Sequence, residues 1–163
     1  MKIIDSPLRM SSIDKDWKLI KTVLPQHTDH AGVMWHGSYL DFLEEGRIDA
    51  LDKVGCSYYE LSKEGFEIPV ISLQIKYKMS FSHGEKVLLN SQFNMESKIR
   101  LRCRTLFLKS NGDTGAEAII KLVVVRKINN SIKLVRDFPA QIKKTLSMLE
   151  DGPKFKELNN HDF

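Results

Sequence analysis

Thirteen residues, His27–Tyr39, bring together three of the five histidines of the chain, one carboxylate and two glycines. The stretch follows a strand-like segment and precedes the strongest helical pattern in the sequence. Loops that a rigid scaffold holds in place often carry binding and catalytic side chains. We therefore expect the functional site here, with Asp29 as its most reactive group.

Two elements must position this loop. Trp17–Leu24 is rich in apolar and β-branched residues and stops at Pro25, which predicts a strand that ends in a turn. From Ser38 to Val54, apolar residues recur at spacings of three and four, which predicts an amphipathic helix. We expect Ser38 to be its N-cap and Gly55 to follow its C-cap.

The rest of the chain predicts an antiparallel sheet. Residues 71–81 alternate between apolar and polar, as in a half-buried strand, and further strands are expected at 86–95, 100–108, 116–128 and 132–135. A closing helix runs from Pro139 to about Leu149. The fold class is α+β, a sheet wrapped around one long central helix. We expect one domain over 1–163, with its core at 17–149 and a frayed tail at 151–163.

Composition limits the classes of function. The chain has 163 residues, 25 basic and 21 acidic, and its net charge of +4 is spread without a Lys/Arg block, which disfavours nucleic-acid binding. No apolar run approaches the ~20 residues that span a bilayer, so we expect no membrane-embedded segment. Cys56 and Cys103 lie far apart and follow no secretory signal, which indicates a reduced, cytoplasmic protein.

The position of Asp29 indicates acyl transfer. The loop can return its carboxylate to the start of the helix, where unpaired N–H groups could stabilise an oxyanion while Asp29 acts as general base or nucleophile. The alternative is that Asp29 only caps a turn through an Asx bond. The GxSxG, GxGxxG and GxxxxGK[ST] patterns are absent, which disfavours serine hydrolase, dinucleotide and P-loop sites.

A metal site is the main competing chemistry, because histidine and carboxylate are common ligands. The candidate ligands are His27, Asp29, His30, His36 and His83. Their His-x-x-His spacing lies in a loop, whereas an HExxH site requires a helix. We therefore expect no metal and no cofactor.

The string DHAGVMWHGSYLDFLEEGR, from Asp29 to Arg47, resembles the signature of the 4-hydroxybenzoyl-CoA thioesterase-like family of hotdog-fold acyl-CoA thioesterases. The resemblance covers roughly residues 19–146, and its specific part is this string. It implies a hotdog fold, dimers or tetramers, and hydrolysis of a CoA thioester, either aromatic or of short to medium chain. An acyl-carrier protein could replace CoA as the acyl donor.

By this resemblance, Asp29 matches the catalytic aspartate, and His36 matches the position whose backbone N–H polarises the thioester carbonyl. We also assign Gly32 and Trp35, within the same motif, to substrate binding. The rival hypothesis is a non-catalytic hotdog protein that binds an acyl-CoA or an acyl-carrier protein.

CoA also carries phosphates, which Arg and Lys side chains bind. The basic residues that we predict to bind them are Lys98, Arg100, Lys133 and Arg136. The alternative for the row Arg100, Arg102 and Arg104 is the solvated outer face of the sheet.

Overall fold

The computed structural model describes residues 15–129, 131–135 and 137–153. Its helices are α1 (His36–Lys53), α2 (Tyr58–Lys63) and α3 (Ala140–Asp151), and a short 3-10 turn covers Pro25–His27. Its strands are β1 (Trp17–Thr22), β2 (Phe66–Glu67), β3 (Val70–Tyr77), β4 (Lys86–Met95), β5 (Arg100–Leu108), β6 (Thr114–Val123), β7 (Val125–Ile128) and β8 (Ser131–Leu134).

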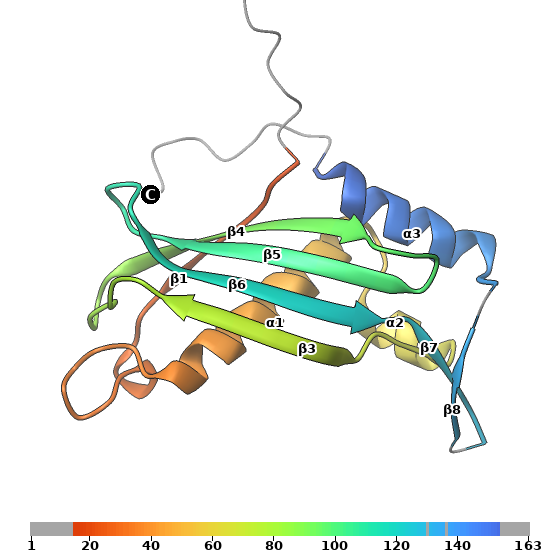
Figure 1. The fold of residues 1–163 in the computed structure, drawn as a ribbon, viewed down its shortest axis with the longest axis horizontal. Coiled ribbons are helices and arrows are strands. Elements are labelled where there is room, and N and C mark those ends of the chain that lie inside the picture. The colour runs from red at the N-terminus through yellow and green to blue at the C-terminus, as the bar shows by residue number, and fades with distance from the viewer. Residues whose placement is uncertain (1–14, 130, 136, 154–163) are drawn as a thin grey trace, which may run out of the picture.

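Five strands form the main sheet in the order β1-β4-β5-β6-β3, and every pair is antiparallel. Helix α1 crosses one face of this sheet, while none of the helices in the described ranges covers the opposite face (Figure 1). A second, small sheet has the order β2-β7-β8. The predicted α+β class with an antiparallel sheet is confirmed. No helix in the described part of the chain is long and apolar enough to cross a membrane.

The central strands follow from their alternating sequence. β4 and β5 have the predicted bounds, and alternate residues are buried on the α1 side, whereas Leu88 and Leu106 lie on the other face. The buried set on these two strands is Val87, Leu89, Phe93, Leu101, Cys103 and Phe107. Arg100, Arg102 and Arg104 alternate with buried residues and lie on the uncovered face, as predicted for a solvated face.

Helix α1 begins earlier than its apolar pattern predicts. Its first residue is His36 and its N-cap is Trp35, so the prediction that Ser38 is the N-cap was wrong. The Ser38 hydroxyl instead donates a hydrogen bond to the His27 carbonyl oxygen at 3.1 Å, which ties the first turn to the preceding loop. At the other end, Gly55 adopts a positive φ of 74° directly after the C-cap Val54, as predicted.

The predicted strand at 116–128 is interrupted. β6 ends at Val123, and the N–H of Val124 donates to the carbonyl oxygen of Ile99 at 2.9 Å. β7 then pairs with β2, outside the main sheet. A continuous apolar run does not reveal this break, because both strands on either side of it are rich in valine and isoleucine.

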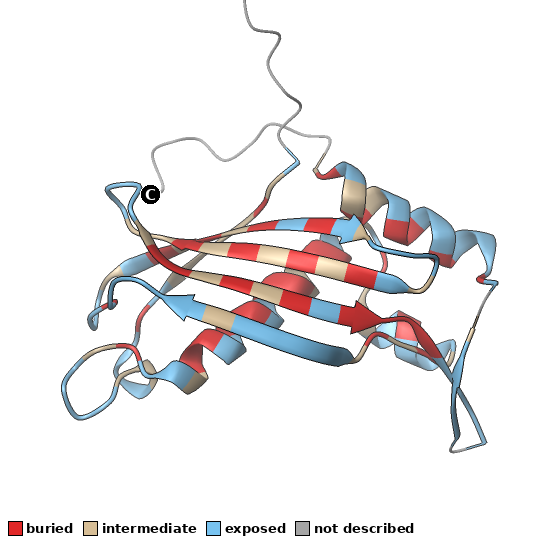
Figure 2. Cartoon of the chain, in the orientation of Figure 1, coloured by how far each residue is buried: buried red, intermediate tan, exposed pale blue. Residues whose placement is uncertain are grey.

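β3 is an edge strand, and its exposure differs from the prediction. Alternation between buried and exposed is expected for seven of its eight residues, 71–77, yet seven of the eight are exposed and Ile75 is intermediate. Leu73 and Tyr77 lie on the α1 side of the sheet, opposite Ile120 and Ala116, but are 41% and 54% exposed. Figure 2 shows β3 almost entirely in the colour of exposed residues. The alternation therefore marks a strand with an apolar side that the described part of the chain covers only in part, at Ile75 and Tyr77.

Arg47 joins α1 to the segment before β3. Its side chain is 7% exposed, and its Nη1 donates to the carbonyl oxygen of Ile68 at 2.7 Å. Its Nη2 pairs with Glu44, three residues earlier on the same helix, and its guanidinium lies 5.6 Å from the centre of the Tyr58 ring. A single buried cation thus holds α1, α2 and the start of the β2–β3 segment together.

Candidate active site

The loop before α1 folds back on itself as a tight hairpin. The N–H of Asp29 donates to the carbonyl oxygen of Val33 at 2.9 Å, and the N–H of Gly32 donates to that of Asp29 at 3.0 Å. Gly32 has a φ of 77°, a conformation that favours glycine. Bridges from Val33 to Ser82, and from the Met34 N–H to the Phe81 carbonyl oxygen at 2.7 Å, fix the loop beside the turn that follows β3.

Only one oxygen of the Asp29 carboxylate accepts hydrogen bonds from the described residues of this loop. Its Oδ1 accepts hydrogen bonds from the N–H groups of Ala31 at 2.8 Å and Val33 at 3.4 Å. The bond to Ala31 is the Asx bond of the structural alternative. Among the residues that the structure describes, none donates a hydrogen bond to Oδ2. Oδ1 therefore fixes the orientation of the carboxylate, and Oδ2 accepts no hydrogen bond from a described residue.

The start of α1 supplies hydrogen-bond donors. Because the helix begins at His36, the N–H groups of His36 and Gly37 have no carbonyl four residues earlier within the helix. The helix dipole makes this end favourable for negative charge. The Trp35 ring packs over Gly37, where an added Cβ would lie 2.2 Å from the nearest indole carbon. Trp35 also meets the His36 ring edge to face at 5.0 Å.

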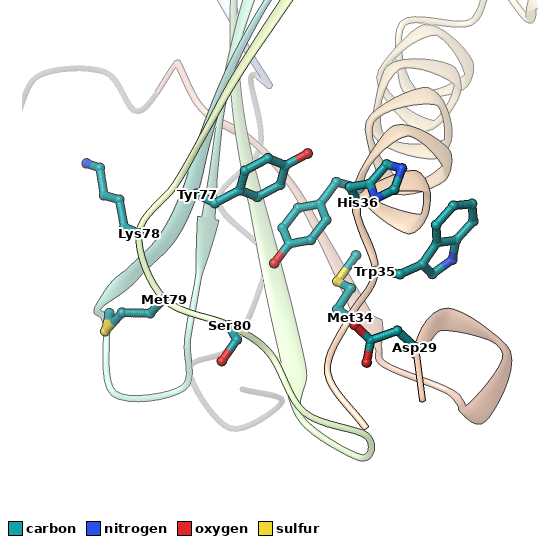
Figure 3. Close-up of a pocket in the computed structure, with 9 residues that line it drawn as sticks. Asp29, Met34, Trp35, His36, Tyr77, Lys78, Met79 and Ser80 are labelled. Atoms are coloured by element: carbon teal, nitrogen blue, oxygen red, sulfur yellow. The ribbon is translucent and has the colours of Figure 1, made fainter. Parts of the chain in front are cut away.

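A pocket of about 490 Å³ brings these parts together. Its walls are the loop, the start of α1 and the end of β3, as Figure 3 shows. The residues that line it are Asp29, Met34, Trp35, His36, Tyr39, Tyr77, Lys78, Met79 and Ser80. In Figure 3 the Tyr77 ring points across the cleft towards the start of the helix. The pocket thus has a carboxylate and helical N–H groups on one side and a largely apolar wall on the other.

Tyr39 anchors the apolar wall. It is buried, and its ring packs against Tyr77 at 5.0 Å and Phe107 at 5.1 Å. Burial, with smaller contributions from the nearby Tyr77 and Glu85, raises the pKa of Tyr39 to about 12. Its hydroxyl therefore stays protonated at neutral pH, when it can donate a hydrogen bond.

The structure brings three predicted site residues to one pocket, namely Asp29, Trp35 and His36. Gly32 shapes the loop but does not line the cavity. The tyrosines of the pocket were missed as site residues, because Tyr39 and Tyr77 both fall on apolar stripes that predict core positions. The signal that could have found Tyr77 is its position at the end of a strand, next to the turn that holds the loop.

The candidate metal ligands that the sequence offered do not form a cluster among the described residues. His27 stacks edge to face on Phe42 at 4.9 Å, and its Nδ1 accepts the N–H of Leu24 at 3.0 Å. Within the described ranges, no group of three or more His, Cys, Asp or Glu side chains is arranged to hold a metal ion.

Three of the four predicted phosphate-binding cations lie away from this pocket within the described chain. Lys98 lines a second cavity of about 440 Å³ between α3 and the β4–β5 turn, and Arg100 is exposed at the start of β5. Lys133 is exposed on β8. Arg136 lies outside the described residues. β3 runs from the end of the sheet near Lys98 to the end near the pocket. From Val70 to Tyr77 this is seven residue steps, about 23 Å.

Comparison with known proteins matches the chain to one protein family. The family model of the thioesterase-like superfamily matches residues 23–146. A Synechocystis protein that is provisionally named an esterase is 28% identical over 142 residues, which are 86% of this chain and 84% of the relative.

Solved structures agree on the fold. A DHNA-CoA thioesterase from Staphylococcus aureus superposes with a TM-score of 0.73 at 23% identity, over 81% of this chain and 89% of that one. A further S. aureus protein, solved in complex with CoA, has a TM-score of 0.76 at 13% identity, over 95% and 97% of the two chains. The predicted family resemblance is confirmed, and an antiparallel sheet with a helix on it fits the hotdog architecture.

Proposed function

Because this chain belongs to the thioesterase-like superfamily, we propose that it hydrolyses acyl-CoA thioesters in the pocket between the Asp29 loop and the end of β3. The observation that carries the proposal is the meeting of one carboxylate and one helix N-terminus in a single pocket. Asp29 is oriented through Oδ1 alone, and His36 begins the helix. This is the pair of groups that acyl transfer requires.

In the proposed reaction the thioester carbonyl oxygen accepts a hydrogen bond from the N–H of His36. Asp29 removes a proton from water, whose oxygen attacks the carbonyl carbon, and the negative charge moves to the carbonyl oxygen beside the helix N-terminus. Collapse of this intermediate breaks the C–S bond and releases CoA, whose sulfur takes up the proton, and a carboxylic acid. In the second route the Asp29 carboxylate attacks the carbonyl carbon, the C–S bond breaks, and CoA leaves as a thiolate that takes a proton from solvent. Water then hydrolyses the acyl-aspartyl anhydride to the carboxylic acid and free Asp29.

The wall formed by Met34, Tyr39, Tyr77 and Met79 suits an acyl group. A volume of about 490 Å³ falls in the range of small-molecule sites. Aromatic rings and flexible thioethers pack well against flat or short aliphatic acyl chains. The fold relative that acts on DHNA-CoA supports an aromatic acyl group, and short to medium aliphatic groups remain in the proposal. Neither route needs a metal or a cofactor, since CoA is part of the substrate.

We further propose that two copies of the chain pair through β3. Its outer edge has no neighbour among the described strands, and Val70, Ile71 and Leu73 are exposed beside it. A long, apolar, unpaired edge strand favours association, and an antiparallel pair of identical strands has twofold symmetry. Light scattering should give the mass of a dimer or tetramer, and a monomer at micromolar concentration would contradict this arrangement.

The experiment that tests the activity is a thiol-release assay against a panel of acyl-CoAs. Asp29→Asn should lower kcat by at least about 100-fold, since a positioned general base contributes on the order of 10²–10⁴. Asp52→Asn, which changes an exposed carboxylate at the far end of α1, should leave turnover unchanged. Added chelator should have no effect.

If Asp29→Asn retains the wild-type rate, the assignment of Asp29 is wrong. If the wild-type protein binds acyl-CoA but cleaves neither CoA nor acyl-carrier-protein thioesters, the protein is the non-catalytic binder of the rival hypothesis.

A further inference from the structure

The β7–β8 hairpin carries cations without matching carboxylates. Residues 125–135 include Arg126, Lys127 and Lys133 but no aspartate or glutamate. Arg126 lies directly opposite Lys133 in the antiparallel pair, so both side chains are on the same face of the hairpin. Like charges in this position repel each other. Neither forms an ion pair with any residue that the structure describes, and an anion between them would relieve the repulsion.

Within one chain, the β7–β8 hairpin lies at the end of the sheet opposite the pocket and is too far away to contact a ligand there. The Lys127 N–H donates to the Gly65 carbonyl oxygen at 2.8 Å, and Arg126 pairs with Phe66, which precedes the start of β3. The pocket is at the other end of β3, about 23 Å away along the strand. The pantetheine arm of CoA, with about thirteen bonds between its sulfur and the nearer phosphorus, spans only about 15 Å, so a thioester in the pocket cannot bring this phosphate to the hairpin of the same chain.

A second copy changes this geometry. This step rests on the proposed function and on the pairing of two copies through β3. Twofold antiparallel pairing reverses the strand, so the end of the partner's β3, with its pocket, lies beside the start of β3 in the first copy. Figure 1 shows that the β7–β8 hairpin extends past β3 at that end. The hairpin begins at Val125, which pairs with Glu67 of β2. Glu67 lies three residues before Val70, about 10 Å along the chain.

We propose that Arg126 and Lys133 of one protomer bind the phosphate groups of the CoA whose thioester occupies the pocket of the other protomer. The planar guanidinium of Arg126 can hold two phosphate oxygens, and it is supported by the Phe66 ring, 5.4 Å away. Lys133 adds a second charge directly across the strand pair. Each site is thereby completed by a second copy of the chain.

The first test compares acyl-CoA with the same acyl group on pantetheine, which lacks both the phosphates and the adenosine of CoA. The variants are Lys133→Gln and the double variant Arg126→Gln with Lys133→Gln. The double variant should raise KM for acyl-CoA by roughly 10- to 100-fold, the loss expected for charged hydrogen bonds, while kcat is unchanged. The same acyl group on pantetheine, which has no phosphate, should be cleaved as by the wild-type protein. Lys127→Gln, on the opposite face of the hairpin, is the matched control and should have no effect.

An unchanged KM for acyl-CoA in the double variant, with its thermal unfolding intact, overturns the proposal. A loss that is equal for acyl-CoA and acyl-pantetheine also overturns it, because that pattern reports damage to the fold or pocket. Lys133→Gln alone changes an exposed side chain and covers the case in which loss of the Arg126–Phe66 contact prevents folding.

The second test asks whether the cations act across the dimer. Chains with Asp29→Asn and chains with the double hairpin substitution are co-expressed with different tags, and mixed dimers are purified. One site of the mixed dimer then has an intact Asp29 and an intact hairpin from the other chain, and it should show the wild-type KM with about half of the wild-type kcat per dimer. If the hairpin acts on its own pocket, no intact site exists, and the low KM is not recovered.

These results separate the inference from the proposed function. If the wild-type protein cleaves no thioester, the proposed function fails before any hairpin variant is made. If turnover is lost in Asp29→Asn but the hairpin variants behave as wild type, only the present inference fails.

Discussion

Replacement of Arg47 by methionine should destabilise the fold and leave catalysis intact. Methionine has a similar reach but no charge and no donor. The change leaves the buried carbonyl oxygen of Ile68 without the hydrogen bond that it accepts at 2.7 Å. Arg47 lies eleven residues after His36, about 16 Å along α1, so the pocket should keep its shape.

The magnitude follows from the contacts of the guanidinium. A hydrogen bond from a charged donor contributes about 1.5–3 kcal/mol, and the cation over the Tyr58 ring adds roughly 0.5–1 kcal/mol. The ion pair with Glu44, whose side chain is 53% exposed, adds below about 1 kcal/mol. Against this, Nε is buried without a hydrogen-bond partner, which costs about 1–3 kcal/mol. The net loss expected for Arg47→Met is about 2 kcal/mol.

Urea unfolding of the two proteins measures this difference, with an unchanged slope to show that the unfolded state is comparable. Glu44→Gln is the matched control and should cost below about 1 kcal/mol, because its partner keeps the bond to Ile68. An Arg47→Met protein as stable as wild type would refute the view that this bond holds α1 to the β2–β3 segment. A large fall in kcat at full stability would show instead that Arg47 serves the reaction.

Three further predictions concern single side chains. Because the pKa of Tyr39 is raised from 10.0 to about 12, its contribution to stability should be present below pH 10 and lost as the pH rises towards 12, and Tyr39→Phe should remove this part of the alkaline transition measured by unfolding. Gly37→Ala should displace the Trp35 ring, which changes tryptophan fluorescence and raises KM; an unchanged emission spectrum would contradict the packing. Burial raises the pKa of the Cys103 thiol to about 11, so in the native protein it should resist a thiol reagent at pH 8 and react on unfolding, as mass spectrometry can show.

The sequence predicts regular elements well where the burial pattern is set within one chain. β4 and β5 alternate because one face meets α1 and the other meets solvent, and their predicted bounds match the structure. β3 alternates equally well but is exposed on both faces, since the alternation records an apolar side and not what covers it. The break at Val124 was also hidden, because the bond of its N–H to Ile99 depends on residues 25 positions apart.

The site was predictable to the extent that it is local. Asp29, Trp35 and His36 lie within eight residues, so one loop and one helix start bring them together. The opposite wall comes from the end of β3, some forty residues later, and its contact with the loop depends on the Val33–Ser82 bridge. A linear motif does not show which residues forty positions away meet it. The alternation of residues 71–81 therefore predicts only a buried position for Tyr77.

The two walls of the pocket come from separate parts of the chain, and this bears on how the proposed activity can diversify. The loop and the start of α1 hold Asp29 and the backbone donors, whereas Tyr77, Met79 and Ser80 come from an exposed strand end and its turn. Mutations on the second wall can therefore be sampled by evolution, or by an engineer, without disturbing the hydrogen bonds that orient Asp29. We expect the part of the acyl selectivity that Tyr77, Met79 and Ser80 determine to change separately from the proposed cleavage of the thioester.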